Sequence, residues 1–123
     1  MKIIKIHTED DISKITETEN IRLEIYLKNA VIPISEMSGE LYTRAVGCKF
    51  PNLTTIFGLV SLDAHKAELP KLTEIQGNLN IHGNDILLPE LRKILGDFKQ
   101  HYTVELPKPV SYTHLRAHET RGN

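Results

Sequence analysis

The sequence predicts a mainly β fold. Coils of about nineteen residues each form a solenoid, one strand from each coil joins a parallel sheet, and an irregular N-terminal cap precedes the coils. Three observations predict it. Glycine, proline, leucine and isoleucine columns recur at every nineteenth position. Segments such as Gly77-Asn78-Leu79-Asn80-Ile81-His82 alternate polar and apolar residues, which is typical of a strand with one buried face. A single coil is too small to fold alone. Burial of its inward side chains stabilises it by roughly 10 kcal/mol, whereas ordering its backbone costs roughly 20 kcal/mol of conformational entropy. The coils must therefore stack.

Residues 1–30 lie outside the period. Ile3, Ile4 and Ile6 form a short apolar strand, residues 8–18 form a polar turn with a possible short helix, and residues 21–25 alternate as a second strand. Terminal units of a solenoid are atypical because they cover the open end of the core. We therefore assign residues 1–30 to an N-terminal cap and an irregular first coil.

Four units of equal length follow, at residues 31–49, 50–68, 69–87 and 88–106. They share the pattern LPxLxxIxGxLxI, although the first unit has Ile32 where the others have proline. The period rests on these columns: Gly39, Gly58, Gly77 and Gly96; Pro51, Pro70 and Pro89; Leu53, Leu72 and Leu91; Ile56, Ile75 and Ile94. In each strand, Leu41, Val60, Leu79 and Phe98 are expected to point inward. Glycine permits a positive φ or a close backbone approach, and proline suits a corner that needs no N–H donor.

The C-terminal segment has a different character. Residues 110–120 resemble, codon by codon, one frame of the transposase-end adapter used in short-read library preparation. Segments that are not part of the natural product are excluded from fold arguments. We therefore assign residues 107–123 to a non-native, disordered tail. The natural protein is then expected to continue past Leu106, with further coils as neighbours, and the sequence to be a metagenomic fragment.

The repeat resembles the leucine-rich-repeat superfamily. It is most similar to short bacterial and phage-associated arrays of IxGxLxI units, and its strand is similar to that of the receptor L domain. Residues 79–86 fit the family segment LxLxxNxL, but the column of Asn84 reads Val46, His65, Asn84 and Thr103. An asparagine ladder is therefore missing. The resemblance implies either a right-handed leucine-rich-repeat-like solenoid or a flatter, β-helix-like one, and a surface that serves in binding or scaffolding.

The composition bounds the function. The 123 residues include 15 Lys and Arg against 16 Asp and Glu, and this near-neutral balance argues against nucleic acid or a membrane surface as partner. No apolar run reaches the roughly 20 residues of a membrane helix. The segment from Met1 to Asp11 lacks the apolar stretch of a secretory signal, so we expect a cytoplasmic protein. With Cys48 alone, neither an intramolecular disulfide nor a CxxC pair is possible.

The outward side chains of the strands are the candidate binding residues. They fall in three columns two residues apart along each strand. The candidates for contact with a protein or glycan are Tyr42, Arg44, Asp63, Asn78, Asn80, His82, Lys99 and His101.

Other chemistry has weaker support. His82 and His101 fall on adjacent rungs near Asp63, but a third firm metal ligand and any HExxH spacing are missing, so we assign no metal and no catalytic residue. Arg44 beside Asp63 predicts a cross-strand ion pair, and His65 is expected in a loop. Cys48 aligns with apolar residues and is expected to be buried and inert. Nucleotide-binding and hydrolase motifs such as GxxxxGK, GxGxxG and GxSxG are absent from the sequence.

Two hypotheses for the function follow. The first is a non-enzymatic repeat module that presents the sheet surface to a protein or glycan and needs no cofactor. The second is a purely structural or assembly segment without a ligand. Both exclude an enzyme.

Overall fold

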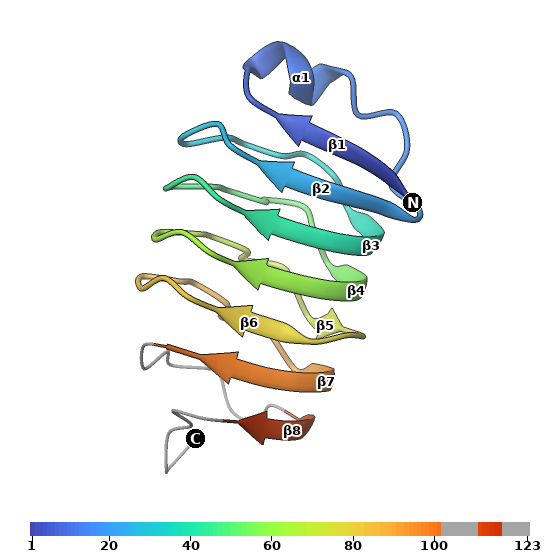
Figure 1. The fold of residues 1–123 in the computed structure, drawn as a ribbon. Coiled ribbons are helices and arrows are strands. Elements are labelled where there is room, and N and C mark those ends of the chain that lie inside the picture. Colours follow the sequence, from blue (N-terminus) through green and yellow to red (C-terminus); the bar gives the residue numbers. More distant parts are fainter. Residues whose placement is uncertain (102–110, 117–123) are drawn as a thin grey trace.

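The computed structural model describes residues 1–101 and 111–116 and shows a β-solenoid with one all-parallel sheet (Figure 1). Successive coils each contribute a strand, and all the strands of Figure 1 point the same way. The elements are β1 (Lys2–Ile6), α1 (Glu9–Ser13), β2 (Ile21–Ile25), β3 (Glu36–Thr43), β4 (Thr55–Leu62), β5 (Glu74–Ile75), β6 (Leu79–Ile81), β7 (Lys93–Gln100) and β8 (Ser111–Arg116). The short strands β5 and β6 are two parts of one rung, because both pair with β4 on one side and with β7 on the other.

The register of the strands confirms the repeat, which has about 19 residues per turn. Strand β3 pairs with β4 so that Leu41 lies beside Val60, and β6 pairs with β7 so that Leu79 lies beside Phe98. Each of these steps has the length that the glycine column predicts. All four of these side chains are fully buried, as the alternating pattern predicts.

The glycines form a column through the stack. Gly39 pairs with Gly58, and the N–H of Gly96 donates to the carbonyl oxygen of Gly77 at 3.1 Å. A Cβ on Gly58 would lie 2.9 Å from the carbonyl carbon of Gly39 and still closer to its oxygen. A Cβ on Gly77 would lie 2.5 Å from the carbonyl of Gly58. Any larger residue in this column would therefore push adjacent coils apart.

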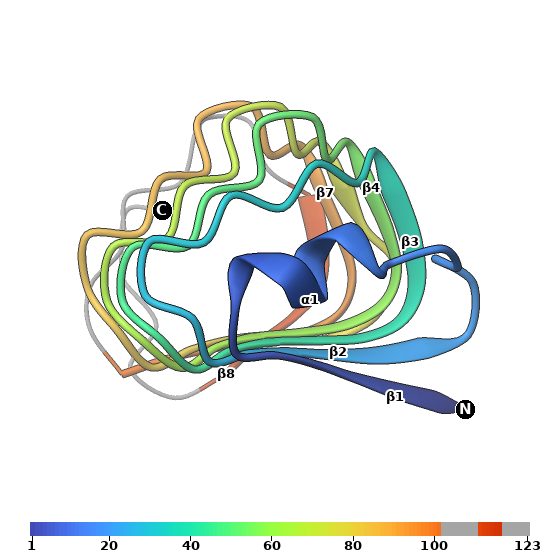
Figure 2. The ribbon, with the colours of Figure 1, turned by 90° about the horizontal axis from the view of Figure 1, so that it is seen from above.

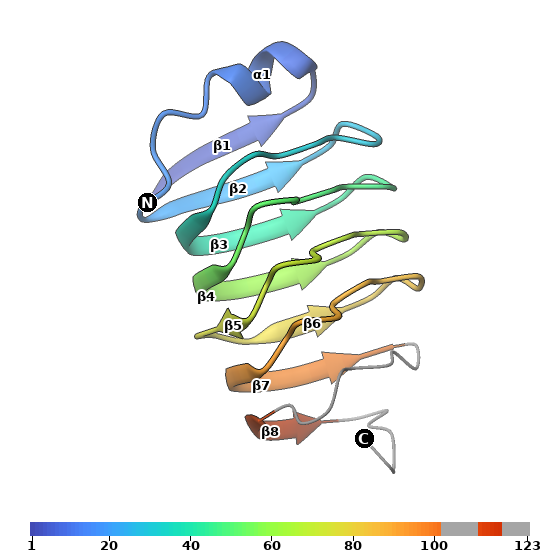
Figure 3. The same ribbon diagram turned by 180° about the vertical axis from the view of Figure 1, so that it is seen from behind.

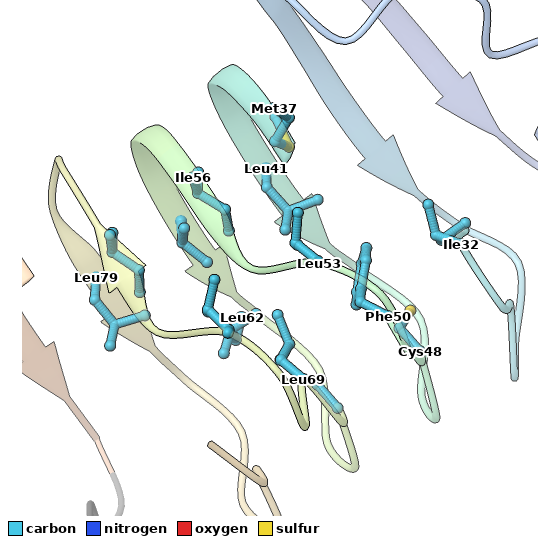
Figure 4. Packing of buried hydrophobic residues seen from close by; sticks show 14 of the residues in the cluster. Ile32, Met37, Leu41, Cys48, Phe50, Leu53, Ile56, Leu62, Leu69 and Leu79 are labelled. Atoms are coloured by element: carbon cyan, nitrogen blue, oxygen red, sulfur yellow. The ribbon is translucent and has the colours of Figure 1, made fainter. Parts of the chain in front are cut away.

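The core fills the space between the sheet and the return segments. Viewed down the stack, each coil forms a broad, rounded loop with its strand along one curved side (Figure 2). In Figure 4, strand residues such as Ile56 and return-segment residues such as Phe50 and Leu69 point into this interior, and all three are fully buried. Cys48 also lies in this core, at 0% exposure, which confirms that it is a buried small residue.

The return segments cross the inner side of the sheet, which faces the reader in Figure 3. Backbone hydrogen bonds between neighbouring coils hold their corners. The N–H of Gly47 donates to the carbonyl of His65, and that of Lys66 to Asn84. This ladder takes the place of the missing asparagine ladder. His65 lies in this corner, outside the strands as predicted, and its Nδ1 accepts the N–H of Asn84 at 2.8 Å.

The same corner repeats a left-handed backbone conformation at four successive positions of the described residues. The φ angles are 59° at Asn29, 83° at Gly47, 63° at Lys66 and 59° at Asp85. Glycine and asparagine adopt this region readily, and lysine does so only at a cost. The next corner is a turn in which the N–H of Leu72 donates to the carbonyl of Leu69. Pro70 is the second residue of this turn, a position that favours proline.

The N-terminal segment is more regular than the sequence suggested. The short helix and both strands are confirmed, but β1 and β2 belong to the same sheet, and the pairing of Lys2 with Ile21 spans one full repeat length. The expectation that residues 1–30 do not follow the period is therefore wrong for this step. The next step is one residue shorter, because Ile21 pairs with Gly39. A bridge between Val31 and Lys49 keeps this shorter register, so the first coil is one residue shorter than the predicted 31–49 unit.

The helix α1 covers the end of the core beside β2 (Figure 2). Ile12 and Ile15 pack against the core. A reciprocal capping box holds the helix start: the Thr8 hydroxyl accepts the N–H of Asp11, and the Asp11 carboxylate accepts the N–H groups of Thr8 and His7. These backbone hydrogen bonds, that of His7 foremost, lower the pKa of Asp11.

The tail departs from the expected disorder at one place. Ser111–Arg116 form β8, which pairs in parallel with β7. The register of this pairing shifts between Ile94 and Asp97 of β7. The expectation of disorder is wrong for these six residues. Residues 107–110 and 117–123, together with 102–106 of the fourth unit, lie outside the described residues. The adapter origin of the tail stays a prediction.

Candidate binding face of the sheet

The outer face of the sheet faces the reader in Figure 1. Alternation with the buried strand residues places the eight predicted residues on this face. The register joins Tyr42 to Ser61, Ser61 to Asn80, and Asn80 to Lys99, so one side chain from each rung forms a single column. The residues that follow the strands form a second column, because the backbone N–H of each donates to a carbonyl on the preceding rung. These residues are Arg44, Asp63, His82 and His101. Asn78 lies in a third column, where its Oδ1 accepts the N–H of Asp97 at 2.8 Å. Tyr42, Asp63 and Asn80 are half-buried, and the other five are exposed.

The cap strands extend this face, which the sequence did not reveal. Strand β2 pairs with β3 so that Arg22 lies beside Glu40 and Glu24 beside Tyr42. Tyr26 follows directly after β2. The alternation of Ile21, Leu23 and Ile25, which predicts this strand, also places the residues between them on the outer face, although the predicted candidates do not include them. We call Arg22, Glu24, Tyr26, Glu40, Tyr42 and Arg44, together with His7, the tyrosine–arginine cluster.

Hydrogen bonds along each strand fix the tyrosines of this cluster. The Tyr26 hydroxyl donates to the Glu24 carboxylate, and the Tyr42 hydroxyl donates to Glu40 at 2.9 Å. Arg22 donates from Nε to Glu24 at 2.6 Å and lies 3.5 Å from Glu40. Each tyrosine is therefore held by a carboxylate that is itself held by Arg22.

Stacking contacts cover the ring faces. The guanidinium carbon of Arg22 lies 4.6 Å from the centre of the Tyr42 ring, and that of Arg44 lies 4.9 Å from it. Both are within the range of cation–π attraction. His7 stacks on Tyr26 with ring centres 4.8 Å apart and planes inclined by 6°. The cluster thus forms a continuous layer across β1, β2 and β3.

The electrostatics of the cluster follow from these contacts. Glu24 is 6% exposed, and the hydrogen bond from Tyr26, helped by Arg22, lowers its pKa despite the opposing effect of burial. The same hydrogen bond raises the pKa of Tyr26, while burial and Glu40 raise that of Tyr42. The bond to Glu24 raises the pKa of Arg22. The Glu24 carboxylate is thus stabilised as an anion and both tyrosines as neutral phenols.

The rest of the outer face has a second group, formed by Ser61, Asp63, His82 and His101. The Ser61 hydroxyl donates to Asp63, whose Oδ1 lies 3.7 Å from Nε2 of His82. The rings of His82 and His101 are 4.5 Å apart. The predicted Arg44–Asp63 ion pair is therefore wrong. Asp63 instead bonds to a serine on its own strand, and Arg44 stacks on Tyr42.

Within residues 1–101, no group of three or more His, Cys, Asp and Glu side chains is arranged to hold a metal ion. Burial raises the pKa of the Cys48 thiol to about 11. No helix in the described part of the chain is long and apolar enough to cross a membrane.

The fold and this face define the chain as a parallel β-solenoid with a polar, partly ordered sheet surface. No protein-family model matches the chain, and comparisons with curated proteins and with solved structures found no significant match. The leucine-rich-repeat resemblance thus has no support from a family or a relative.

Proposed function

We propose that this protein is a non-enzymatic repeat module that binds a protein or glycan partner through the outer face of its sheet. The observation that supports the proposal is the tyrosine–arginine cluster. Tyrosine and arginine dominate the energetics of binding surfaces, and here their side chains are already fixed by hydrogen bonds and stacking. A fixed surface loses less conformational entropy when a partner binds.

The position of the cluster also favours binding over a role in the fold. The hydrophobic core is complete beneath the sheet, and the cluster adds no side chain to it. Two tyrosines and two arginines on neighbouring rungs are far more ordered than a solvated surface requires. The resemblance to leucine-rich-repeat arrays, which mostly serve as binding or scaffolding surfaces, agrees with this proposal.

A purely structural role is the second candidate. The hydrogen bonds of the cluster link β2 to β3, since Arg22 contacts both Glu24 and Glu40. If the cluster serves only to join the cap to the first repeat, its removal will lower stability and no ligand will depend on it.

The test compares three chains: the natural sequence, the double variant Tyr26→Ala/Tyr42→Ala, and the control Phe57→Ala. Phe57 is an exposed aromatic residue outside the cluster. Each chain is presented to a displayed peptide library and to a glycan array, and its free energy of unfolding is measured in urea. We expect ligands that bind the natural chain and the control but bind the double variant at least about tenfold more weakly, as for hot-spot residues.

The unfolding data separate the two candidates. A loss of less than about 1 kcal/mol in the double variant, with the loss of ligands, supports the binding role. A loss above about 3 kcal/mol, with no ligand that distinguishes the chains, supports the structural role instead.

A further inference from the structure

Two arginines contact the same ring but differ in their ionic partners. Arg22 has a carboxylate oxygen at 2.6 Å and a second at 3.5 Å. Arg44 stacks on Tyr42 at a similar distance, yet it makes no ion pair within the described part of the chain. Arg44 is also exposed, so its charge faces solvent.

The neighbours of Arg44 explain this difference. Asp63, on the next rung, is turned toward Ser61 and His82. Tyr26, on the preceding rung, directs its hydroxyl to Glu24. Glu40, on the same strand as Arg44, is engaged by Tyr42 and Arg22. The carboxylate of Glu24 is engaged by Tyr26 and Arg22 and attracts Arg44 only at longer range. The guanidinium of Arg44 is therefore held by its stacking contact and makes no salt bridge within residues 1–101.

We infer that Arg44 is the anchor for a carboxylate of an acidic peptide segment in a protein partner, an inference that rests on the proposed binding role of this face. A guanidinium that lies over a ring keeps its in-plane N–H groups available, and these match the two oxygens of a carboxylate. Holding the side chain in advance lowers the entropy lost when that bond forms.

The ring contacts favour a peptide over a glycan. A sugar binds an aromatic residue by lying on its open face, but Tyr42 carries the guanidinium groups of Arg22 and Arg44, and Tyr26 carries His7. The groups left for a ligand are the N–H donors of Arg44 and the ring edges. An Asp or Glu side chain on an extended segment reaches such a donor from above the sheet.

The test is an NMR titration of the full chain that follows the Nε–Hε signals of its arginines. The probe is acetyl-tetraglutamate amide, and the neutral comparison is acetyl-tetraglutamine amide. We expect tetraglutamate alone to give a saturable shift at Arg44, at least about twice that at Arg22, at low salt where ion pairing is least screened. The ring signals of Tyr42 are followed in the same titration, and their shift should vanish in Arg44→Gln. The shift should persist in the control Lys93→Gln, which removes an exposed cation on β7, outside the cluster.

A third titration uses tetragalacturonate, an acidic glycan. Three titration results would overturn the inference: no saturable shift at Arg44, an equal shift with tetraglutamine, or tighter binding of tetragalacturonate than of tetraglutamate. The last would identify an acidic glycan as the ligand. Library ligands that depend on Tyr26 and Tyr42 but carry no carboxylate would also overturn it, while leaving the proposed function in place. If no library ligand depends on the cluster, the proposed function fails, whatever the titration shows.

Discussion

Replacing Gly58 with alanine tests the packing of the coils most directly. The backbone of Gly58 is not in the left-handed region, so the substitution adds a Cβ without φ strain. That Cβ would lie 2.9 Å from the carbonyl carbon of Gly39 and closer still to its oxygen, and ordinary contacts begin near 3.4 Å. Strands β3 and β4 must then move apart until this contact is relieved. Weakening two ladder hydrogen bonds at about 1 kcal/mol each, with some loss of packing, gives a destabilisation of about 3 kcal/mol.

The assay is urea unfolding followed by circular dichroism at neutral pH, with Gln76→Ala as the control. Gln76 is exposed and its side chain bonds to Glu74 on the same rung, so its loss should change the free energy of unfolding by less than about 0.5 kcal/mol. If Gly58→Ala is as stable as the control, contact between the backbones is not what restricts this column to glycine.

Four further predictions concern single side chains. Thr43 is 1% exposed and its hydroxyl has no hydrogen-bond partner, so Thr43→Val should raise the free energy of unfolding by about 1 kcal/mol in urea; a loss of stability would show that the hydroxyl is satisfied. Lys66 has a φ of 63°, so Lys66→Gly should raise the melting temperature, with a gain of about 1 kcal/mol; an unchanged value would argue against strain at this corner. Cys48 is buried with a pKa of about 11, so its thiol should react with a disulfide reagent at mildly alkaline pH only after urea is added, and fast reaction of the folded chain would contradict its burial. The pKa of Glu24 is lowered below its ordinary value of 4.5, so its charge stabilises the fold above that pH and this contribution is lost as the pH falls through the folded pKa. The stability difference between the natural chain and Glu24→Gln should therefore shrink on acidification, and a constant difference would refute the assignment.

The fold was predictable because the core repeats. Leu41, Val60, Leu79 and Phe98 are apolar at one spacing, and the glycine column keeps the same spacing. Both constraints come from stacking: a column of buried side chains must stay apolar, and a close backbone approach must stay free of Cβ atoms. A physical requirement that recurs in every coil leaves a signal that one sequence can show.

The N-terminal rungs were not predictable in the same way. Gly39 pairs with Ile21, so the glycine column ends one rung before the cap. The step from β2 to β3 is one residue shorter than the period. The segment between Pro33 and β3 has one residue fewer than the equivalent segment between Pro51 and β4, which accounts for the difference. Losing one residue in a corner leaves the strands paired but breaks the period, so a search at a fixed spacing stops at the first repeat.

The contacts on the outer face were only partly predictable. Alternation placed every candidate residue on the correct side of the sheet, but it could not choose partners. An outward side chain has neighbours on the adjacent rung, about 4.8 Å away, and two residues along its own strand, about 6.6 Å away. Side-chain length and competition decide between them: Asp63 bonds along its strand to Ser61, and Glu40 bonds both ways, to Tyr42 and Arg22.

The contrast between the two faces of the sheet bears on function. The inner column of Leu41, Val60, Leu79 and Phe98 stays apolar in every coil, while the outer column beside it changes from Glu40 to Leu59 to Asn78 to Asp97. A spacer needs only a soluble outer face, and coils that perform the same task have no physical reason to differ in hydrogen bonding. Here the stacked tyrosines and arginines lie on β2 and β3, whereas the later rungs carry the Ser61, Asp63 and histidine contacts instead. Such a change from rung to rung is what a binding site on a regular scaffold would produce, and it makes Arg44 and Tyr42 the first residues to change.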